Sequence, residues 1–153
     1  CCVPITQIQC NTWKKNINTD ELTKKGLFCS TDDIITAKIW KALVAIRMKQ
    51  VGPLQDDQKT TISRAYNVRK RMKPKLDSGY FGNFTTGIRT SMLVCDIIKM
   101  KPREIALRLR SDLQNVMTEM IFARGKWLKE QYEQSRSVTP VMDDKAMTFL
   151  ISS

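Results

Sequence analysis

The fold is decided by the stretch Asn67-Val-Arg-Lys-Arg-Met-Lys-Pro-Lys-Leu-Asp-Ser-Gly-Tyr-Phe-Gly-Asn83, which combines a cationic run, a proline and an aromatic turn with two glycines. Five Lys and Arg side chains lie within residues 67–75, and such groups donate charge-assisted hydrogen bonds that suit a polyanion such as phosphate. Pro74 prevents a helix from continuing, and the glycines permit a sharp turn around Tyr80 and Phe81. A solvated basic loop with a buried aromatic anchor is the alternative interpretation, because charge runs are commonly solvated.

Strands are expected on both sides of this stretch. Residues 60–68 alternate the apolar Ile62 and Tyr66 with smaller or polar neighbours, and residues 84–98 are rich in Thr, Ile, Met and Val. The first strand would place the basic run at its end, where ligands commonly bind in α/β proteins.

A long helix is expected to begin after Ser30. Ser30 can cap the helix, and Asp33 lies three residues later, at the capping-box position. The predicted apolar stripe consists of Ile35, Ile39, Leu43 and Ile46, widened by Trp40 and Ala42, and Gly52-Pro53 end the helix.

The remaining elements complete a mixed pattern. Strands are expected over residues 3–13 and 146–152, and a short capped helix over residues 18–22 is ended by Gly26. A second helix begins at Pro102, carries apolar residues at helical spacing through Met117, Met120 and Ile121, and can extend to Tyr132. Residues 135–144 are expected to form a loop. The order of strands and helices predicts an α/β fold (α+β two-layer), with a mixed β-sheet and packed helices.

The totals restrict the class of protein. The 153 residues fit one domain, and the net charge of +11 predicts attraction to anionic ligands. Neither a long apolar run nor a leader is in view, and five cysteines without C-x-x-C spacing suggest reduced thiols in a cytoplasmic protein. Because the chain begins with Cys and ends in an expected strand, we expect a piece of a longer protein.

The residue types exclude several kinds of catalysis within this chain. With no histidine, Ser-His-Asp and Cys-His arrangements and a zinc site completed by histidine are absent. The adjacent pairs Asp32-Asp33 and Asp143-Asp144 make poor acid/base dyads, because neighbouring side chains on a helix do not face each other. No Walker-type or Rossmann glycine pattern occurs. These absences favour a binding half over a complete catalyst, so no catalytic residue is assigned.

Four pieces, taken together and in order, resemble one family. They are Ser30-Thr-Asp-Asp-Ile-Ile-Thr-Ala-Lys-Ile-Trp40 with Arg47, then Asn67-Val-Arg-Lys-Arg71, then Gly79-Tyr-Phe-Gly-Asn83, then Leu150-Ile-Ser-Ser153. This combination resembles the BAHD acyltransferases, which belong to the chloramphenicol-acetyltransferase-like superfamily. The resemblance implies that residues 1–153 are part of the C-terminal domain, half of a two-domain fold.

The resemblance also implies an activity for the full-length protein. A BAHD enzyme transfers an acyl group from acyl-CoA, a co-substrate, to a small-molecule alcohol or amine acceptor in a tunnel between two α/β halves. The general base is the His of a His-x-x-x-Asp motif in the N-terminal domain, which is the expected partner of this chain. An Asp-Phe-Gly-Trp-Gly motif is expected after Ser153. No metal and no nucleic acid are implied.

Site residues follow from the resemblance by position. One cluster would lie near CoA at a helix start: Ser30, Thr31, Asp32 and Asp33. A second cluster would line the CoA site, together with Ser153: Asn67, Val68, Arg69, Lys70, Arg71, Met72 and Lys73. Ser152 would face the acceptor. A helix N-terminus suits anions and guanidinium groups suit phosphates, so we expect both clusters to share a groove. Three positions depart from the family pattern: Asn67 stands for an aspartate, and Lys75 and Asp77 stand for prolines.

Two other functions stay open. Residues 64–75 could bind nucleic acid as a basic interaction module, although no RNA-recognition or helix-turn-helix signature appears. The chain could also belong to a catalytically inactive acyltransferase-like scaffold. A full reading frame with the upstream His-x-x-x-Asp motif supports the enzyme, and the same motif without its histidine supports the scaffold.

Overall fold

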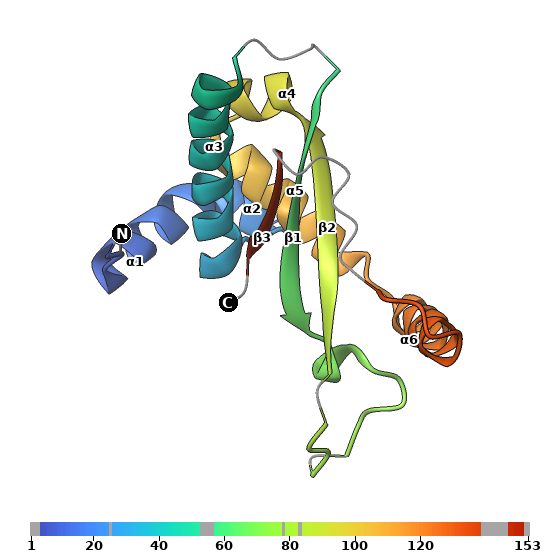
Figure 1. Cartoon of the computed structure of the whole chain (residues 1–153). Helices are drawn as coiled ribbons and strands as arrows, with labels where there is room; N and C mark the ends of the chain where they lie inside the picture. The colour runs from blue at the N-terminus through green and yellow to red at the C-terminus, as the bar shows by residue number, and fades with distance from the viewer. Residues whose placement is uncertain are drawn as a thin grey trace.

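The computed structural model describes residues 4–24, 26–52, 57–77, 79–82, 84–138 and 147–151. The elements in chain order are α1 (Gln7–Ile17), α2 (Asp20–Lys24), α3 (Thr31–Val51), β1 (Lys59–Asn67), the 3-10 turn η1 (Arg69–Arg71), β2 (Thr85–Leu93), α4 (Val94–Lys99), α5 (Pro102–Gln114), α6 (Thr118–Glu133) and β3 (Thr148–Ile151). The predicted α/β class with a mixed sheet and packed helices is confirmed (Figure 1).

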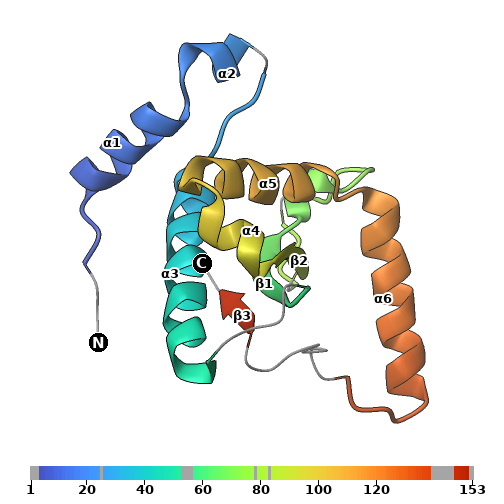
Figure 2. The ribbon, with the colours of Figure 1, turned by 90° about the horizontal axis from the view of Figure 1, so that it is seen from above.

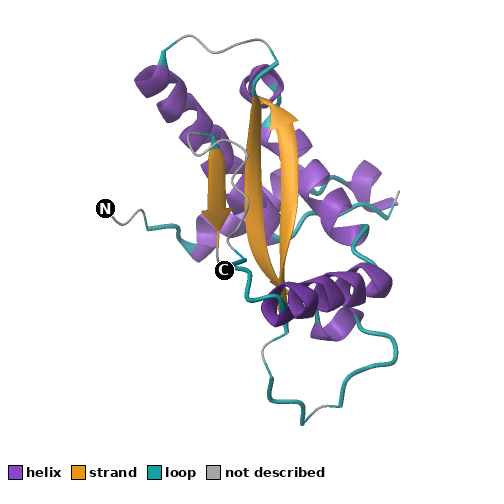
Figure 3. Cartoon of the chain, turned by 45° about the vertical axis from the view of Figure 1, so that its right-hand side comes forward, coloured by secondary structure: helices purple, strands orange, loops and turns teal. Residues whose placement is uncertain are grey.

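The sheet has β1 at its centre, in the order β2-β1-β3 (Figure 3). β2 pairs antiparallel with β1 from Lys59 opposite Leu93 to Asn67 opposite Thr85, and β3 pairs parallel with β1 from Thr61 opposite Thr148. The long antiparallel pair holds the basic segment, residues 67–75, and the described residues of the loop after it at one end of the molecule, away from α4 (Figure 1).

The core lies between the sheet and the helices α3, α4 and α5 (Figure 2). Trp40 of α3 is fully buried, and its indole Nε1 donates to Thr60 Oγ1 at 3.0 Å. Thr60 Oγ1 in turn donates to the Met147 carbonyl oxygen at 2.9 Å, so the polar atoms at this point of the core are satisfied. The fully buried apolar side chains around them include Ile62, Ile97, Ile105, Leu109 and Met147.

Helix α3 confirms the predicted cap but buries a different face. The buried apolar residues are Ile34, Ala37, Trp40 and Val44, whereas Ile39 and Ile46 of the predicted stripe are exposed. The prediction was right for Trp40 and wrong for Ile39 and Ile46, because α3 is apolar on more than one side and spacing alone does not decide which side faces the core.

The expected strand over residues 3–13 is wrong. Residues 7–17 form α1, which Thr6 begins with a capping box: Thr6 Oγ1 accepts from the Gln9 amide at 3.2 Å, and Gln9 Oε1 accepts from the Thr6 amide at 2.9 Å. The β-branched residues of this segment favour a strand, but the cap and the inward positions of Cys10 and Ile17 favour the helix.

Two other predicted elements have different bounds. The strand expected over residues 84–98 ends at Leu93, because its partner β1 begins at Lys59, and α4 follows. The long helix expected from Pro102 is two helices, because Asn115 ends α5 and Met117 is extended. Thr148–Ile151 confirm a C-terminal strand, and residues 146 and 152 lie outside the described residues.

Helix α6 stands apart from the body of the molecule in two views (Figures 1 and 2). Side-chain hydrogen bonds hold it to the rest of the described chain: Thr118 Oγ1 donates to the Arg71 carbonyl oxygen, and Arg124 Nη1 donates to the Gly87 carbonyl oxygen, both at 2.9 Å. Met117, before the helix, and Met120 within it are exposed, contrary to the buried face expected from their spacing.

Candidate functional site

The start of α3 is organised by Ser30. Its Oγ accepts a hydrogen bond from the Asp33 amide at 3.2 Å and donates to Asp33 Oδ2 at 2.8 Å. The Ser30 amide also donates to Asp33 Oδ2 at 2.8 Å, so the capping box predicted from the sequence is confirmed. The first turn of α3 is therefore a fixed structure, and its Asp33 side chain points into the protein.

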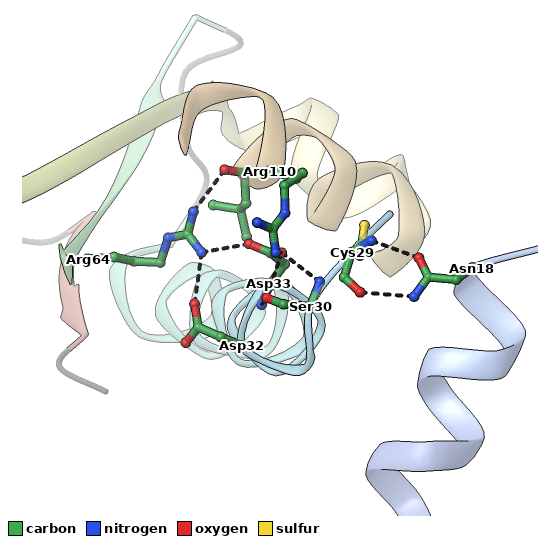
Figure 4. A network of polar contacts seen from close by, with 8 residues as sticks. Asn18, Cys29, Ser30, Asp32, Asp33, Arg64 and Arg110 are labelled. Carbon is green, nitrogen blue, oxygen red and sulfur yellow. Dashed lines mark hydrogen bonds and ion pairs between the residues drawn. The ribbon is translucent and has the colours of Figure 1, made fainter. Parts of the chain in front are cut away.

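Two arginines from other elements meet the buried Asp33 carboxylate (Figure 4). Arg64 of β1 places Nη1 2.9 Å from Asp33 Oδ1 and 3.1 Å from Asp32 Oδ2, and its Nη2 donates to the Leu109 carbonyl oxygen at 2.8 Å. Arg110 of α5 pairs with Asp33 Oδ2. Two carboxylates thus face two guanidinium groups and their formal charges balance, with Asp33 and both arginines buried and Asp32 at the solvent-exposed edge.

The Cys29 backbone is held beside this network. Asn18 Nδ2 donates to the Cys29 carbonyl oxygen at 2.9 Å, and Asn18 Oδ1 accepts from the Cys29 amide at 2.7 Å. Burial, followed by the negative charge of Asp33, raises the pKa of the Cys29 thiol from its ordinary 9.0 to about 11. Because the thiolate is the nucleophile, this buried thiol is inert at neutral pH.

The raised pKa of Cys29 predicts how stability changes in alkali. The unfolded thiol ionises near pH 9.0, whereas the folded thiol stays protonated until about pH 11, so this contribution is complete below pH 9 and is lost between these values. We expect the difference in unfolding free energy between wild type and Cys29→Ala to shrink from pH 9 to pH 11 in urea titrations. An unchanged difference across this range would contradict the raised pKa.

The basic segment follows β1 directly and forms η1. The Arg69 amide donates to Asn67 Oδ1 at 3.1 Å, so Asn67 closes the turn through its side chain. The Arg69 guanidinium donates to the Gly82 carbonyl oxygen, which connects η1 with the aromatic turn. The Arg71 guanidinium carbon lies 5.7 Å from the centre of the Tyr66 ring. These contacts fix η1, and Asn67, the last residue of β1, contributes to them although the resemblance leads us to expect an aspartate at this position.

A groove of about 470 Å³ lies beside the basic segment. It is lined by Lys70, Arg71, Met72, Lys73 and Lys75 on one side and by Val116, Met117, Thr118 and Glu119 on the other. Four cations against one carboxylate give this groove a positive field, which favours a phosphorylated ligand.

A second, more apolar groove of about 610 Å³ lies between α6 and the start of β2. Its lining includes Val68, Phe84, Ile121, Phe122 and Leu128, with Arg124 and Lys126. The aromatic turn nearby leaves Phe81 fully exposed, and Tyr80 packs edge-to-face on Phe84 with ring centres 5.8 Å apart. The alternative of a buried aromatic anchor is therefore wrong for the two aromatic residues at the tip of this turn.

Comparison with known proteins decides the family. A family model described as "Transferase family" matches residues 7–153, which is nearly the whole chain. The chain belongs to the BAHD acyltransferase family. Trichothecene 3-O-acetyltransferase of Saccharomyces cerevisiae (strain ATCC 204508 / S288c) is a curated relative, 41% identical over 59 residues that make up 38% of this chain and 12% of the relative.

Solved structures share this BAHD fold. F. sporotrichioides TRI101, complexed with coenzyme A and T-2, superimposes with a TM-score of 0.71 at 21% identity, covering 96% of this chain and 33% of TRI101. F. graminearum TRI101, complexed with coenzyme A and deoxynivalenol, gives 0.73 at 20% identity, covering 95% and 31%. Vinorine synthase gives 0.62 at 15% identity, covering 97% and 30%. The chain thus spans about a third of these solved proteins.

The site residues expected from the BAHD resemblance form two clusters. Neither groove at the basic segment is lined by any of Ser30–Asp33, so the expected common groove is not seen in the described residues. Asp33 is fully buried and Asp32 contacts Arg64, while Val68 and Met72 are buried beside the basic segment. Ser152 and Ser153 lie outside the described residues. Contact of any of these residues with CoA stays a prediction.

Sequence reasoning missed Arg64 and Arg110, although a signal existed. Arg64 lies on β1 in the same side-chain alternation as the buried Ile62, and Arg110 follows Leu109 on the buried side of α5. A charge at a position where periodicity predicts burial implies a buried partner of opposite sign, and Asp33 is that partner in this BAHD chain.

The described part of this BAHD chain lacks two kinds of feature. No helix there is long and apolar enough to cross a bilayer. The same residues contain no group of three or more Cys, Asp or Glu side chains that could hold a metal ion.

Proposed function

We propose that the protein carrying this chain transfers an acyl group from acyl-CoA to an alcohol or amine acceptor, and that this chain supplies CoA-binding surface. The match of the family model to residues 7–153 carries the proposal. The names of the relatives support it, since two TRI101 structures contain coenzyme A and the curated relative is an O-acetyltransferase. The nucleic-acid and inactive-scaffold alternatives gain no support from these comparisons.

Within this proposal, the basic segment binds the phosphates of CoA. Lys70, Arg71, Lys73 and Lys75 line the positive groove, and the contacts of Asn67 and Arg69 fix the turn that presents them. Ser30 and Thr31 lie at the partly exposed start of α3, where the Thr31 amide can face an anion, whereas the Ser30 amide already donates to Asp33. Ser153 and the acceptor contact of Ser152 belong to the same proposal.

The general base is proposed to lie outside this chain. We assign the 153 residues to the C-terminal domain of a two-domain enzyme, whose N-terminal domain brings the His-x-x-x-Asp motif. A cytoplasmic location is part of the same proposal. In the described residues, Asp32 and Asp33 pair with arginine and the Cys29 thiol is protonated at neutral pH, so these groups serve structure instead of proton transfer.

The test is the affinity for CoA of the protein expressed from its full reading frame. Arg71→Ala is expected to raise the Kd for CoA about tenfold, because one charge-assisted hydrogen bond contributes about 1.5 kcal/mol. The turnover at saturating acyl-CoA should change much less. Titration calorimetry and initial rates measure the two effects.

Lys99→Ala is the control, because it also removes one cation, here an exposed one from α4, which lines neither groove described above. Its Kd for CoA should stay within a factor of two of wild type. Unchanged affinity of Arg71→Ala with reduced turnover would assign Arg71 another role. Failure of the wild-type protein to bind CoA would reject the proposed function itself.

A further inference from the structure

Arg64 is the contact that joins the two candidate clusters. It lies in β1 three residues before Asn67, which is roughly 10 Å along a strand. Its side chain leaves β1 on the side of the helices and reaches the first turn of α3 and the last turns of α5 (Figure 4). One buried side chain therefore connects the strand that carries the basic segment to the helix that begins at Ser30.

The geometry of this contact requires arginine. The guanidinium group uses both terminal nitrogens on three acceptors, namely Asp32, Asp33 and the Leu109 carbonyl oxygen. A planar fork can serve acceptors on two helices at once, whereas the ammonium of lysine is a single point of charge. Arg110 is less completely bonded, since its buried Nε has no hydrogen-bond partner in the described chain.

Buried ion pairs contribute little net stability, because removing two charges from water offsets most of their attraction. Their best-attested use is to select one arrangement of packed elements among several that an apolar core would tolerate. Here the arrangement concerns β1 and α3, because Arg64 bonds to Asp32 and Asp33 only when strand and helix have one relative position.

We propose that Arg64 is a positioning residue, which fixes the basic segment after β1 relative to the first turn of α3. The inference rests on the proposed function, since it assigns both clusters to one phosphorylated ligand, CoA. In the described residues, neither groove beside the basic segment is lined by the start of α3, so the relation of the two clusters depends on how firmly β1 is held against α3. Arg64 makes no contact with the ligand itself in this proposal.

The experiment uses the protein expressed from its full reading frame and four variants. Arg64→Met removes the guanidinium and keeps an apolar side chain of similar length, and Arg64→Lys keeps the charge. Arg64→Met combined with Asp32→Asn removes both charges of one pair and leaves Asp33 with Arg110. Leu113→Ala is the control for stability, because it creates a cavity in α5 without removing a member of the network.

Three quantities are measured for each variant: the Kd for CoA, the KM for acyl-CoA against kcat, and amide hydrogen exchange at residues 30–34. We expect Arg64→Met and the double variant to raise Kd and KM by up to about tenfold, which is the loss of about one charge-assisted hydrogen bond to a misplaced partner, with a smaller change in kcat. Exchange at residues 30–34 should become faster in both. Arg64→Lys should give an intermediate result, and Leu113→Ala should change the melting temperature without changing Kd.

The outcomes distinguish a positioning role of Arg64 from a contribution to stability alone. If the double variant melts close to wild type but binds CoA weakly, positioning is separated from stability and the inference holds. Wild-type affinity for CoA in Arg64→Met would overturn it, as would an equal loss of affinity in Leu113→Ala. If the wild type does not bind CoA, the proposed function fails. Exchange at residues 30–34 then decides the role of Arg64 alone, and an unchanged rate in Arg64→Met overturns the inference.

Discussion

Replacing Asp33 with alanine is expected to lower the free energy of unfolding by about 3–5 kcal/mol, because it leaves two buried guanidinium groups without their shared carboxylate. Arg64 retains Asp32 as a partner, but the side chain of Arg110 loses its ion pair. The substitution also removes the carboxylate that accepts from Ser30, so the cap of α3 is lost in the same step. Urea-induced unfolding at neutral pH measures the change.

Asp112→Ala is the matched control for this prediction. It also removes one carboxylate from an ion pair with an arginine, but Arg108 is largely exposed and the pair lies at the surface. The expected loss is therefore about 0–1 kcal/mol. Equal losses for the two variants would show that water reaches the Asp33 network, and the account of its burial would be wrong.

The second large effect concerns catalysis. The 153-residue chain alone is expected to consume no acyl-CoA thioester above the uncatalysed rate, because it contains no histidine. In the described residues, the Cys29 thiol has its pKa raised to about 11 and the carboxylates of Asp32 and Asp33 pair with arginine. None of these groups is poised to accept the proton of an alcohol at pH 7.

Release of free thiol from acetyl-CoA measures this directly, with the protein from the full reading frame as the positive control. Circular dichroism of the isolated chain shows whether it is folded during the assay. Turnover by the folded chain alone would show that a proton acceptor lies within these residues. The proposal that a second domain supplies the general base would then be wrong.

Local chemistry made much of the fold predictable. The cap at Ser30, the strand before the basic segment and the helix that begins at Pro102 each depend on neighbouring residues in the sequence. The errors arose where pairing or capping outweighed propensity. Residues 94–98 include the β-branched Val94, Ile97 and Ile98, but the pairing with β1 ends at Lys59 opposite Leu93, so this segment forms α4.

The candidate site was predictable only in its parts. The sequence predicted the cations of η1 and the cap of α3. It did not indicate that neither groove beside the basic segment is lined by the start of α3 in the described residues. The network around Asp33 joins residues that lie more than thirty positions apart, namely Arg64 on β1 and Arg110 on α5. Periodicity indicates that these positions are buried, but it does not state which carboxylate meets them.

The bond from Arg124 to the Gly87 carbonyl oxygen has a consequence for how this protein behaves in concentrated solution. β2 lies at the rim of the described sheet, and a rim strand is a template for backbone pairing with another molecule. The guanidinium of Arg124 occupies one of the acceptors that such pairing needs and brings a positive charge to it. We therefore expect this contact of Arg124 to oppose pairing of β2 with a strand of a second molecule.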